Sequence, residues 1–323
     1  MTRLTQRPPR PASRRRFIAI GAATAGLAAL PPSLRGAAPA ASWRGIALGA
    51  GASLTLAGMT LAEARPLFRR VESELNRLED IFSLYRPHSA LSRLNKTGVL
   101  RNPAPEFLEL LSLADAIHAE TNGAFDPTVQ PLWTLYADAI RQHRLPDRAE
   151  TSRARRLVGW DLVRFDTDRI YFLRPGMAIT LNGVAQGYIS DRIAQLLRAR
   201  GLRDVLVDMG EIHALGHRPG GGPWRVGIRS PDGAVLSPRL ALSDRALATS
   251  APMGTVLDSS GKIGHIFDPG TGRPAASWTQ VSVSADTAAM ADGLATAFCL
   301  MERADILRTA SKFESVRIEA LLV

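Results

Sequence analysis

The chain has 323 residues, of which 46% are hydrophobic, and it carries 40 Lys and Arg against 30 Asp and Glu. Seven of the arginines lie in residues 1–40, which hold no acidic residue, so residues 41–323 contain 33 basic and 30 acidic side chains. This near balance argues against a nucleic-acid partner, and the hydrophobic content argues against disorder beyond residue 40.

The first 40 residues have the three regions of an export signal. Residues 13–18 read SRRRFI, residues 19–30 form a mild apolar run, and Ala38-Pro39-Ala40 supplies small residues for cleavage. A pair of arginines in this place is typical of the twin-arginine (Tat) route. The apolar run is too short to cross a membrane, which takes about 20 residues. We therefore predict a signal peptide at 1–40, a periplasmic protein at 41–323, and no membrane span after cleavage.

The first half of the remaining chain alternates between strand and helix patterns. Residues 44–58 are predicted to form one strand. Apolar residues at steps of three and four predict helices at 61–81 and 105–120. Between these helices, residues 82–95 are predicted to form a polar loop. The charged residues 146–156 are expected to form a surface excursion.

The second half contains shorter elements. Strands are predicted at 161–172, 177–181, 205–215, 224–229, 246–250, 281–284 and 316–323. Helices are predicted at 188–200, after a glycine turn, and at 287–301, where Cys299 is expected to fill the core. Because a single cysteine cannot form an intramolecular disulfide, no such bond is expected. The elements have no regular βαβ rhythm, which favours an α+β fold with a mixed sheet over a doubly wound one.

The glycine turn at 182–187 is the first candidate for chemistry. Gly183 and Gly187 let the backbone approach a ligand closely, and the start of the following helix offers free amide groups to an anion. Glycine turns before helices are also common without any ligand. This turn alone therefore favours a purely structural role.

A histidine and an aspartate mark the second candidate, residues 264–272. His265 is a possible general base, although a lone histidine on an apolar strand is more often a core residue with satisfied hydrogen bonds. Asp268 precedes Pro-Gly-Thr-Gly, so we expect it to cap the backbone amides of that turn.

The third candidate is the helix that follows Asp286. Asp292 and Thr296 are four residues apart, so both oxygens would lie on one helix face and suit a hard cation such as Mg²⁺. The alternative is a solvated helix face. The apolar neighbours of Asp292 argue against that alternative, because a buried aspartate needs a partner. Asp286 is expected to cap the start of the helix.

Six segments in this order resemble the ApbE family of FAD:protein FMN transferases. They are residues 82–95 (FSLYRPHSALSRLN), 123–129 (GAFDPTV), 181–191 (LNGVAQGYISD), 248–250 (ATS), 265–272 (HIFDPGTG) and 291–296 (ADGLAT). Each segment alone is short enough to arise by chance. Six in the same order are specific.

The resemblance implies a two-lobed α+β domain with FAD in the cleft between the lobes. It implies Mg²⁺-dependent transfer of FMN from FAD to a Thr or Ser hydroxyl of an acceptor protein, with release of AMP. The backbone carbonyl of Ala185, with Asp292 and Thr296, would hold the metal, and His265 would be the base. The residues implied for the FAD site are Tyr85, Ala124, Phe125, Asp126, Asn182, Tyr188 and Ile266.

Several positions depart from the family pattern. Gln186 replaces a common lysine, so one positive charge near the diphosphate is missing. Asn182 replaces a glycine, Ala251 replaces another, and residues 48–50 read Leu-Gly-Ala where Met-Gly-Thr is common. The export signal also resembles that of NosX, the accessory member associated with flavinylation of NosR, which would make NosR the acceptor.

Two other functions are compatible with the same residues. An FAD pyrophosphatase would use water in place of the acceptor hydroxyl and give FMN and AMP. A periplasmic protein that binds or carries FAD without turnover is the other alternative, and Gln186 is the residue that favours it.

Overall fold

The computed structural model describes residues 39–230 and 233–323, so residues 1–38 of the predicted export signal lie outside the described residues. A seven-stranded sheet forms the larger part of the molecule, in the order β1-β2-β6-β7-β10-β11-β12. Every neighbouring pair in it is antiparallel. The strands are β1 (Ala40–Ala47), β2 (Ala50–Ala57), β6 (Val205–Asp208), β7 (Ile212–Leu215), β10 (Arg245–Ser250), β11 (Gln280–Ala285) and β12 (Arg317–Leu322).

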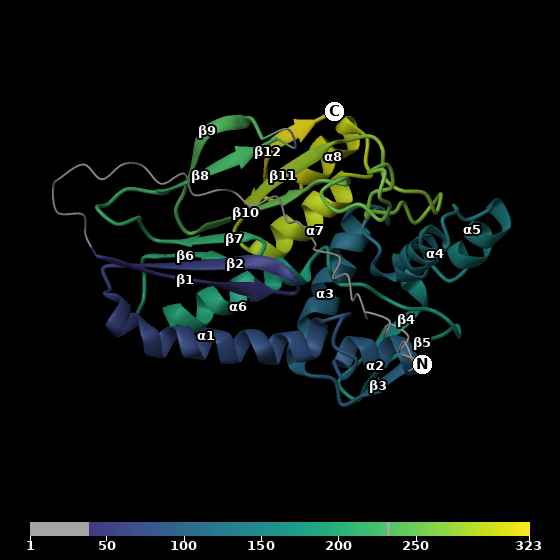
Figure 1. Ribbon diagram of the computed structural model, residues 1–323, viewed down its shortest axis with the longest axis horizontal. Coiled ribbons are helices and arrows are strands. Elements are labelled where there is room, and N and C mark those ends of the chain that lie inside the picture. Colours follow the sequence, from purple (N-terminus) through teal and green to yellow (C-terminus); the bar gives the residue numbers. More distant parts are fainter. Residues whose placement is uncertain (1–38, 231–232) are drawn as a thin grey trace, which may run out of the picture.

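The two faces of this sheet are covered differently. Helices α1 (Leu61–Phe82), α6 (Ala185–Arg198) and α7 (Ala288–Phe298) pack on one face. The hairpin of β8 (Trp224–Arg229) and β9 (Val235–Leu242) covers part of the other face through a separate apolar cluster. In Figure 1 the hairpin lies above the sheet, while α1 and α6 lie below it.

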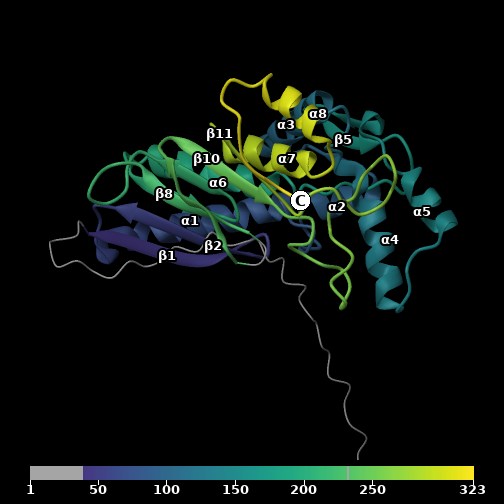
Figure 2. The same ribbon diagram turned by 90° about the horizontal axis from the view of Figure 1, so that it is seen from above.

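A smaller lobe lies beyond one end of α1. It contains the helices α2 (Ala90–Thr97), α3 (Pro105–Glu120), α4 (Gln130–Arg141) and α5 (Arg148–Arg155). Its three-stranded sheet has the order β3 (Val99–Arg101), β5 (Arg169–Phe172) and β4 (Val163–Phe165). The short turns η1 (Pro127–Val129) and η2 (Trp160–Leu162) and the helix α8 (Arg303–Ala310) complete the elements. Figure 2 shows α4 and α5 projecting from this lobe.

These observations confirm the predicted α+β class, but the predicted mixed sheet is wrong, because every pair of neighbouring strands among the described residues is antiparallel. The helices predicted at 61–81 and 105–120 are α1 and α3, and α1 begins with a capping box between Thr60 and Glu63. Within the described residues, no helix has both the length and the apolar character needed to cross a membrane.

The strand predicted at 44–58 is wrong in one respect, because the chain turns back in its middle. Leu48 and Gly49 both adopt positive φ, at 48° and 84°, which joins β1 to β2 as a tight hairpin. The predicted strands at 161–172 and 205–215 are also hairpins, and Gly210 (φ 107°) lies in the turn of the second.

Two segments predicted to lack regular structure are helical. The predicted loop at 82–95 contains the start of α2, where Ser89 Oγ accepts a hydrogen bond from the amide of Ser92. The charged excursion contains α5, which a capping box between Asp147 and Glu150 begins. Helix α4 was not predicted. Helix α2 is only eight residues long, and α5 buries no residue, so neither offers a long apolar repeat from which periodicity could predict it.

Residues 177–181 were predicted to form a strand but belong to no sheet among the described strands. In place of a neighbouring strand, the side chain of Asn95 forms hydrogen bonds with the backbone of this segment. The amide group of Asn95 donates to the carbonyl of Ile179 and accepts from its N–H, both at 2.8 Å. Asn95 thus holds this segment against α2 just before the chain enters the glycine turn.

Candidate active site

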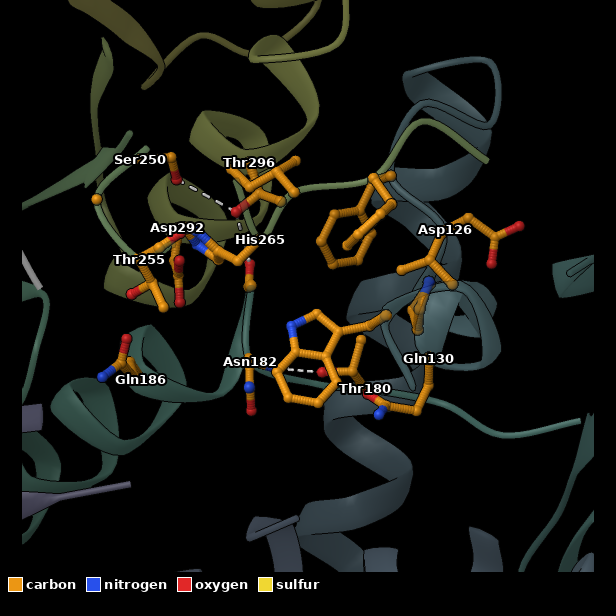
Figure 3. Close-up of a pocket in the computed structure, with 18 of the residues that line it drawn as sticks. Asp126, Gln130, Thr180, Asn182, Gln186, Ser250, Thr255, His265, Asp292 and Thr296 are labelled. Carbon is orange, nitrogen blue, oxygen red and sulfur yellow. Dashed lines mark hydrogen bonds between the residues drawn. The ribbon is translucent and has the colours of Figure 1, made fainter. Parts of the chain in front are cut away.

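A pocket of about 410 Å³ is lined by residues of both the seven-stranded sheet with its helices and the smaller lobe. Its wall comes from α4 and η1, the glycine turn, β10, α7 and the loop between β10 and β11. Figure 3 shows Ser250, Thr255, His265, Asp292 and Thr296 gathered on one side of it, and Asp126 and Gln130 on the other.

The pocket brings together most of the residues named from the sequence. These are Tyr85, Ala124, Phe125, Asp126, Asn182, His265, Ile266, Asp292 and Thr296. They range from Tyr85 to Thr296, which are 211 positions apart along the chain, so only the fold places them together.

Two of the named residues do not line the pocket. Tyr188 is buried, its hydroxyl donates to the Glu109 carboxylate, and its ring packs edge-on against Phe82 with the centroids 5.5 Å apart. Ala185 is fully buried at the start of α6, between the pocket residues Gly183 and Gln186. The prediction that Tyr188 lines the FAD site does not fit this placement, because its side chain points toward α1 and α3.

The start of α6 crosses α7 at very close range. The amide of Gly187 donates to Asp292 Oδ2 at 3.1 Å. A Cβ on Gly187 would lie 2.2 Å from the carbonyl oxygen of Ala288. Glycine is therefore required here by the neighbouring backbone. This contact fixes the glycine turn relative to Asp292.

Asp191 strengthens the same crossing one turn later. Its buried carboxylate accepts hydrogen bonds from the amides of Ala288 (2.8 Å) and Ala289 (2.9 Å), the first amides of α7. Its Oδ1 also lies 2.6 Å from Nδ1 of His213. Sequence reasoning did not identify this role of Asp191, although the residue ends the 181–191 segment.

The predicted cap of α7 was wrong. Thr287, not Asp286, is the N-cap, and its hydroxyl accepts from the amide of Met290 at 3.3 Å. Asp286 is exposed and lies 3.8 Å from Arg245. Because Asp191 already satisfies two amides of this helix end, α7 needs no charged cap of its own.

The pocket wall contains two buried carboxylates, Asp292 and Glu211, and the charge of Asp292 acts on Glu211. Burial raises the pKa of Asp292 to about 7, and the negative charge of Asp191 adds to this effect. Burial also raises the pKa of Glu211, and the charges of Asp292 and Asp208 raise it further. Glu211 accepts the amide of Thr249 at 3.1 Å. Sequence reasoning missed Glu211, because nothing in the order of residues indicates that it faces Asp292.

The oxygen atoms around Thr296 fit a magnesium ion. Thr296 Oγ1 lies 3.2 Å from Ser250 Oγ and 3.5 Å from the carbonyl of Gly183. With the Asp292 carboxylate, these are hard oxygen donors, which Mg²⁺ prefers. No three His, Cys, Asp or Glu side chains in the described part of the chain form a complete metal cluster. A bound Mg²⁺ would need only these few oxygen donors from the protein, because this ion usually completes its coordination with water and phosphate oxygens.

The hydrogen bonds of His265 determine which ring nitrogen carries the proton. Nδ1 lies 3.1 Å from the carbonyl oxygens of both Pro252 and Thr255. A carbonyl can only accept, so Nδ1 is the protonated nitrogen and Nε2 keeps its lone pair. Burial lowers the pKa of His265. A neutral imidazole with a free Nε2 is the form that a general base requires.

The segment after His265 is held as the sequence predicted. Asp268 Oδ1 accepts from the amides of Gly270 (2.7 Å) and Thr271 (3.2 Å), which confirms its predicted role in the turn. Phe267 packs against Tyr136 of α4, with the ring centroids 4.9 Å apart. The turn and α4 thus hold the segment that directly follows His265.

The Ala124–Asp126 stretch is anchored by its backbone. The carbonyl of Phe125 lies 2.8 Å from Nδ1 of His118, and its amide donates to Thr121 Oγ1 at 3.1 Å. Asp126 Oδ1 accepts from the amide and the hydroxyl of Thr128, at 2.7 and 2.5 Å. These bonds tie this wall of the pocket to the end of α3.

The pocket lining is rich in acids and poor in bases. Asp126, Glu211 and Asp292 contribute to it, and none of the described residues that line it is Lys or Arg. Gln186 packs over Gly210, since a Cβ at Gly210 would lie 2.6 Å from the amide nitrogen of Gln186. An anionic ligand in this pocket therefore needs a positive charge that the lining does not supply.

The chain is similar in sequence and in structure to known flavin transferases. The chain is 30% identical over 308 residues to the FAD:protein FMN transferase of Salmonella typhimurium, covering 90% of this chain and 86% of that protein. The solved structure of the flavin transferase ApbE from Vibrio cholerae matches with a TM-score of 0.76 and 26% identity, covering 87% of this chain and 94% of that one. The ApbE protein from Thermotoga maritima matches with a TM-score of 0.76 and 28% identity, with the same coverage.

The ApbE family model matches residues 48–322, which include all three candidate segments of the site. The described part of the match begins in the β1–β2 turn and ends with β12. This chain belongs to the ApbE family.

Proposed function

We propose that this chain is a magnesium-dependent FAD:protein FMN transferase. The observation that carries the proposal is one pocket that holds both the oxygen donors of Asp292 and Thr296 and a histidine whose Nε2 is free to accept a proton. The names of the relatives and the match of the family model support the same reaction.

The roles of the chain's own residues follow from the site. Nε2 of His265 accepts the proton of the acceptor's Thr or Ser hydroxyl. The hydroxyl oxygen bonds to the phosphorus of the FMN half, the bond from that phosphorus to the bridging oxygen breaks, and AMP leaves with that oxygen. The backbone carbonyl of Ala185, with Asp292 and Thr296, would hold Mg²⁺, which when bound would neutralise charge on the diphosphate.

The flavin would occupy the apolar end of the pocket. Tyr85, Phe125 and Ile266 lie in the lining, and Asn182 stands at the start of the glycine turn between them and the metal donors. In this arrangement the diphosphate would lie between the aromatic wall and Asp292, and the acceptor hydroxyl would approach on the side of His265.

The cellular setting is part of the proposal. Residues 1–40 would direct export by the twin-arginine route, and this route carries proteins that have already folded. FAD made in the cytoplasm would then be carried out in the pocket. The acceptor would be an envelope protein with a flavin domain on the periplasmic side, with NosR as the first candidate.

An FAD pyrophosphatase is the second candidate, and the free Nε2 of His265 supports it equally, because water also has a proton to lose. The third, an FAD carrier, draws support from Gln186, which leaves the lining without a cation among its described residues.

One experiment separates the three. The protein without residues 1–40 is mixed with FAD, MgCl₂ and the periplasmic flavin domain of NosR. Covalent flavin is followed by in-gel fluorescence and AMP by chromatography. Fluorescent acceptor with AMP is the expected result. AMP and free FMN without labelled acceptor would favour the pyrophosphatase, and bound, intact FAD would favour the carrier.

A further inference from the structure

The hydroxyl of Thr296 forms its hydrogen bonds outside its own helix. A threonine inside a helix often turns its hydroxyl back to the carbonyl four residues earlier, which here belongs to Asp292. No such bond is present among the described residues. Thr296 Oγ1 lies instead 3.2 Å from Ser250 Oγ on β10 and 3.5 Å from the carbonyl oxygen of Gly183. Figure 3 shows the contact with Ser250 as a dashed line.

Ser250 is itself tied to α7 by a second contact. The buried thiol of Cys299 donates a weak hydrogen bond to the carbonyl of Ser250, with a distance of 3.7 Å from Sγ to the oxygen. The backbone of Ser250 also pairs with Val281 of β11. Thr296 and Cys299 are three residues apart, so both contacts come from the same side of α7. The residue that carries the Ser250 hydroxyl is thus held between α7 and the neighbouring strand.

The proton of the Thr296 hydroxyl limits how this side chain can hold a cation. A hydroxyl has one proton and two lone pairs, and a cation attracts a lone pair and repels the proton. The proton therefore needs an acceptor elsewhere, and Ser250 Oγ is the nearer of the two oxygens around Thr296 Oγ1. The proposed metal ligands are Ala185, Asp292 and Thr296. The lone pairs of Ser250 thus remain available for this proton.

We propose that Ser250 is a positioning residue for the metal site, because it accepts the proton of Thr296 and keeps a lone pair of that hydroxyl free for the cation. The inference rests on the proposed function, in which Thr296 binds Mg²⁺. Without the Ser250 hydroxyl, Thr296 is free to turn back to the carbonyl of Asp292, and its oxygen is lost as a ligand. Residues that orient a metal ligand typically contribute about 10- to 100-fold to metal affinity.

The same strand offers a matched control. The hydroxyl of Thr249, the residue before Ser250, lies 2.9 Å from Ser282 Oγ of β11. Ser282 is fully buried and does not line the pocket. Ser282→Ala therefore removes a hydroxyl contact of the same kind from the same strand, while both partners of Thr296 stay in place.

The first measurement is Mg²⁺ binding in the absence of FAD, by titration calorimetry. Ser250→Ala is expected to raise the dissociation constant of Mg²⁺ about tenfold. Ser250→Thr keeps the hydroxyl and should stay within about threefold of wild type, and Ser282→Ala within about twofold. The Mg²⁺ concentration that gives half-maximal release of AMP from FAD should shift in the same order. Thermal melting checks that each variant is folded.

A double-mutant cycle separates positioning from direct metal binding. Thr296→Val removes the hydroxyl and keeps the shape of the side chain, so we expect Mg²⁺ binding to weaken about tenfold or more. If Ser250 acts only through Thr296, adding Ser250→Ala to Thr296→Val weakens binding by no more than about twofold. A further loss of about tenfold in the double variant would mean that Ser250 binds the metal itself, and would overturn the positioning role.

The other outcomes also decide between the two proposals. Wild-type Mg²⁺ affinity in folded Ser250→Ala would overturn the positioning role and leave the proposed function intact. An equal loss in Ser282→Ala and Ser250→Ala would also overturn it, because the effect would then come from the strand as a whole. Mg²⁺ binding that neither Asp292→Asn nor Thr296→Val weakens would place the metal elsewhere, and would overturn the metal site of the proposed function.

Discussion

The amide of Gly187 donates a hydrogen bond of 3.1 Å to the carboxylate of Asp292, although 105 residues separate the two in the chain. This bond joins the glycine turn to α7. The backbone that is proposed to approach a diphosphate and the carboxylate that is proposed to hold a metal are therefore tied together. Asp191 reinforces the unit by accepting the amides of Ala288 and Ala289.

The first prediction concerns this close crossing. Gly187→Ala places a Cβ 2.2 Å from the backbone carbonyl of Ala288, which cannot move without shifting α7. We expect the free energy of unfolding to fall by about 1–3 kcal/mol, as in other overpacked cores. Gly227→Ala is the control, because nothing lies within 4 Å of a Cβ at that position of β8. Urea unfolding of both variants measures the difference. Equal stabilities would mean that α6 and α7 are not locked together.

The second prediction concerns the metal. Asp292→Asn keeps the shape of the side chain but removes its charge, so we expect FAD cleavage to fall by roughly 100-fold or more. Calorimetry in the absence of FAD should show weaker Mg²⁺ binding. Asp286→Asn, on the exposed residue two positions before α7, is expected to change neither. If Asp292→Asn were as active as wild type, the metal would have to lie elsewhere.

The third prediction concerns pH. Burial lowers the pKa of His265 below the ordinary histidine value of about 6.5. At saturating Mg²⁺, which would keep the Asp292 carboxylate ionised, protonation of Nε2 of His265 is the step that removes activity. The rate should then stay constant from about pH 8 to below about 6.5 and should fall only as the pH drops through the lowered pKa of His265. The measurement is kcat for FAD cleavage against pH. A rate already reduced by half at about pH 7 would contradict a buried neutral histidine as the base.

A variant complements the pH profile. In His265→Asn the side-chain amide can still donate to the carbonyls of Pro252 and Thr255, so the loop should keep its structure. The group at the position of Nε2 is lost, and kcat should fall by about 10²–10⁴. FAD binding, followed by flavin fluorescence, should remain within a few-fold of wild type.

The fourth prediction concerns the missing charge. Gln186→Lys adds a positive charge to a lining that contains Glu211 and Asp292 but, among its described residues, no Lys or Arg. Without added Mg²⁺, the dissociation constant of FAD should fall about tenfold, since one extra charge near a diphosphate contributes on the order of 1 kcal/mol. Gln195→Lys, on the exposed side of the same helix, controls for net charge. Equal affinity in both variants would place the diphosphate away from Gln186.

Helices and strands could be predicted where the pattern of residues within the element itself accounts for its stability. Helix α1 and helix α3 present apolar residues at steps of three and four, so their bounds were predicted within a residue. Helices α2 and α5 could not be found in this way, because α2 spans only eight residues and α5 buries no residue at all. The early strand is predicted as continuous because the left-handed conformation of Leu48 is not encoded by a turn-forming residue type.

The sequence by itself determined the family and the types of residue that the site uses. Short motifs were enough to select His265, Asp292 and Thr296 as candidate site residues, because the spacing of residues in one helix or one turn is a local property. The tertiary structure alone decided which way each group faces. It placed the hydroxyl of Tyr188 on Glu109 rather than in the pocket, brought Glu211 beside Asp292, and set the proton of His265 on Nδ1 through two loop carbonyls. These relationships depend on how distant elements pack, and no local pattern of residues records them.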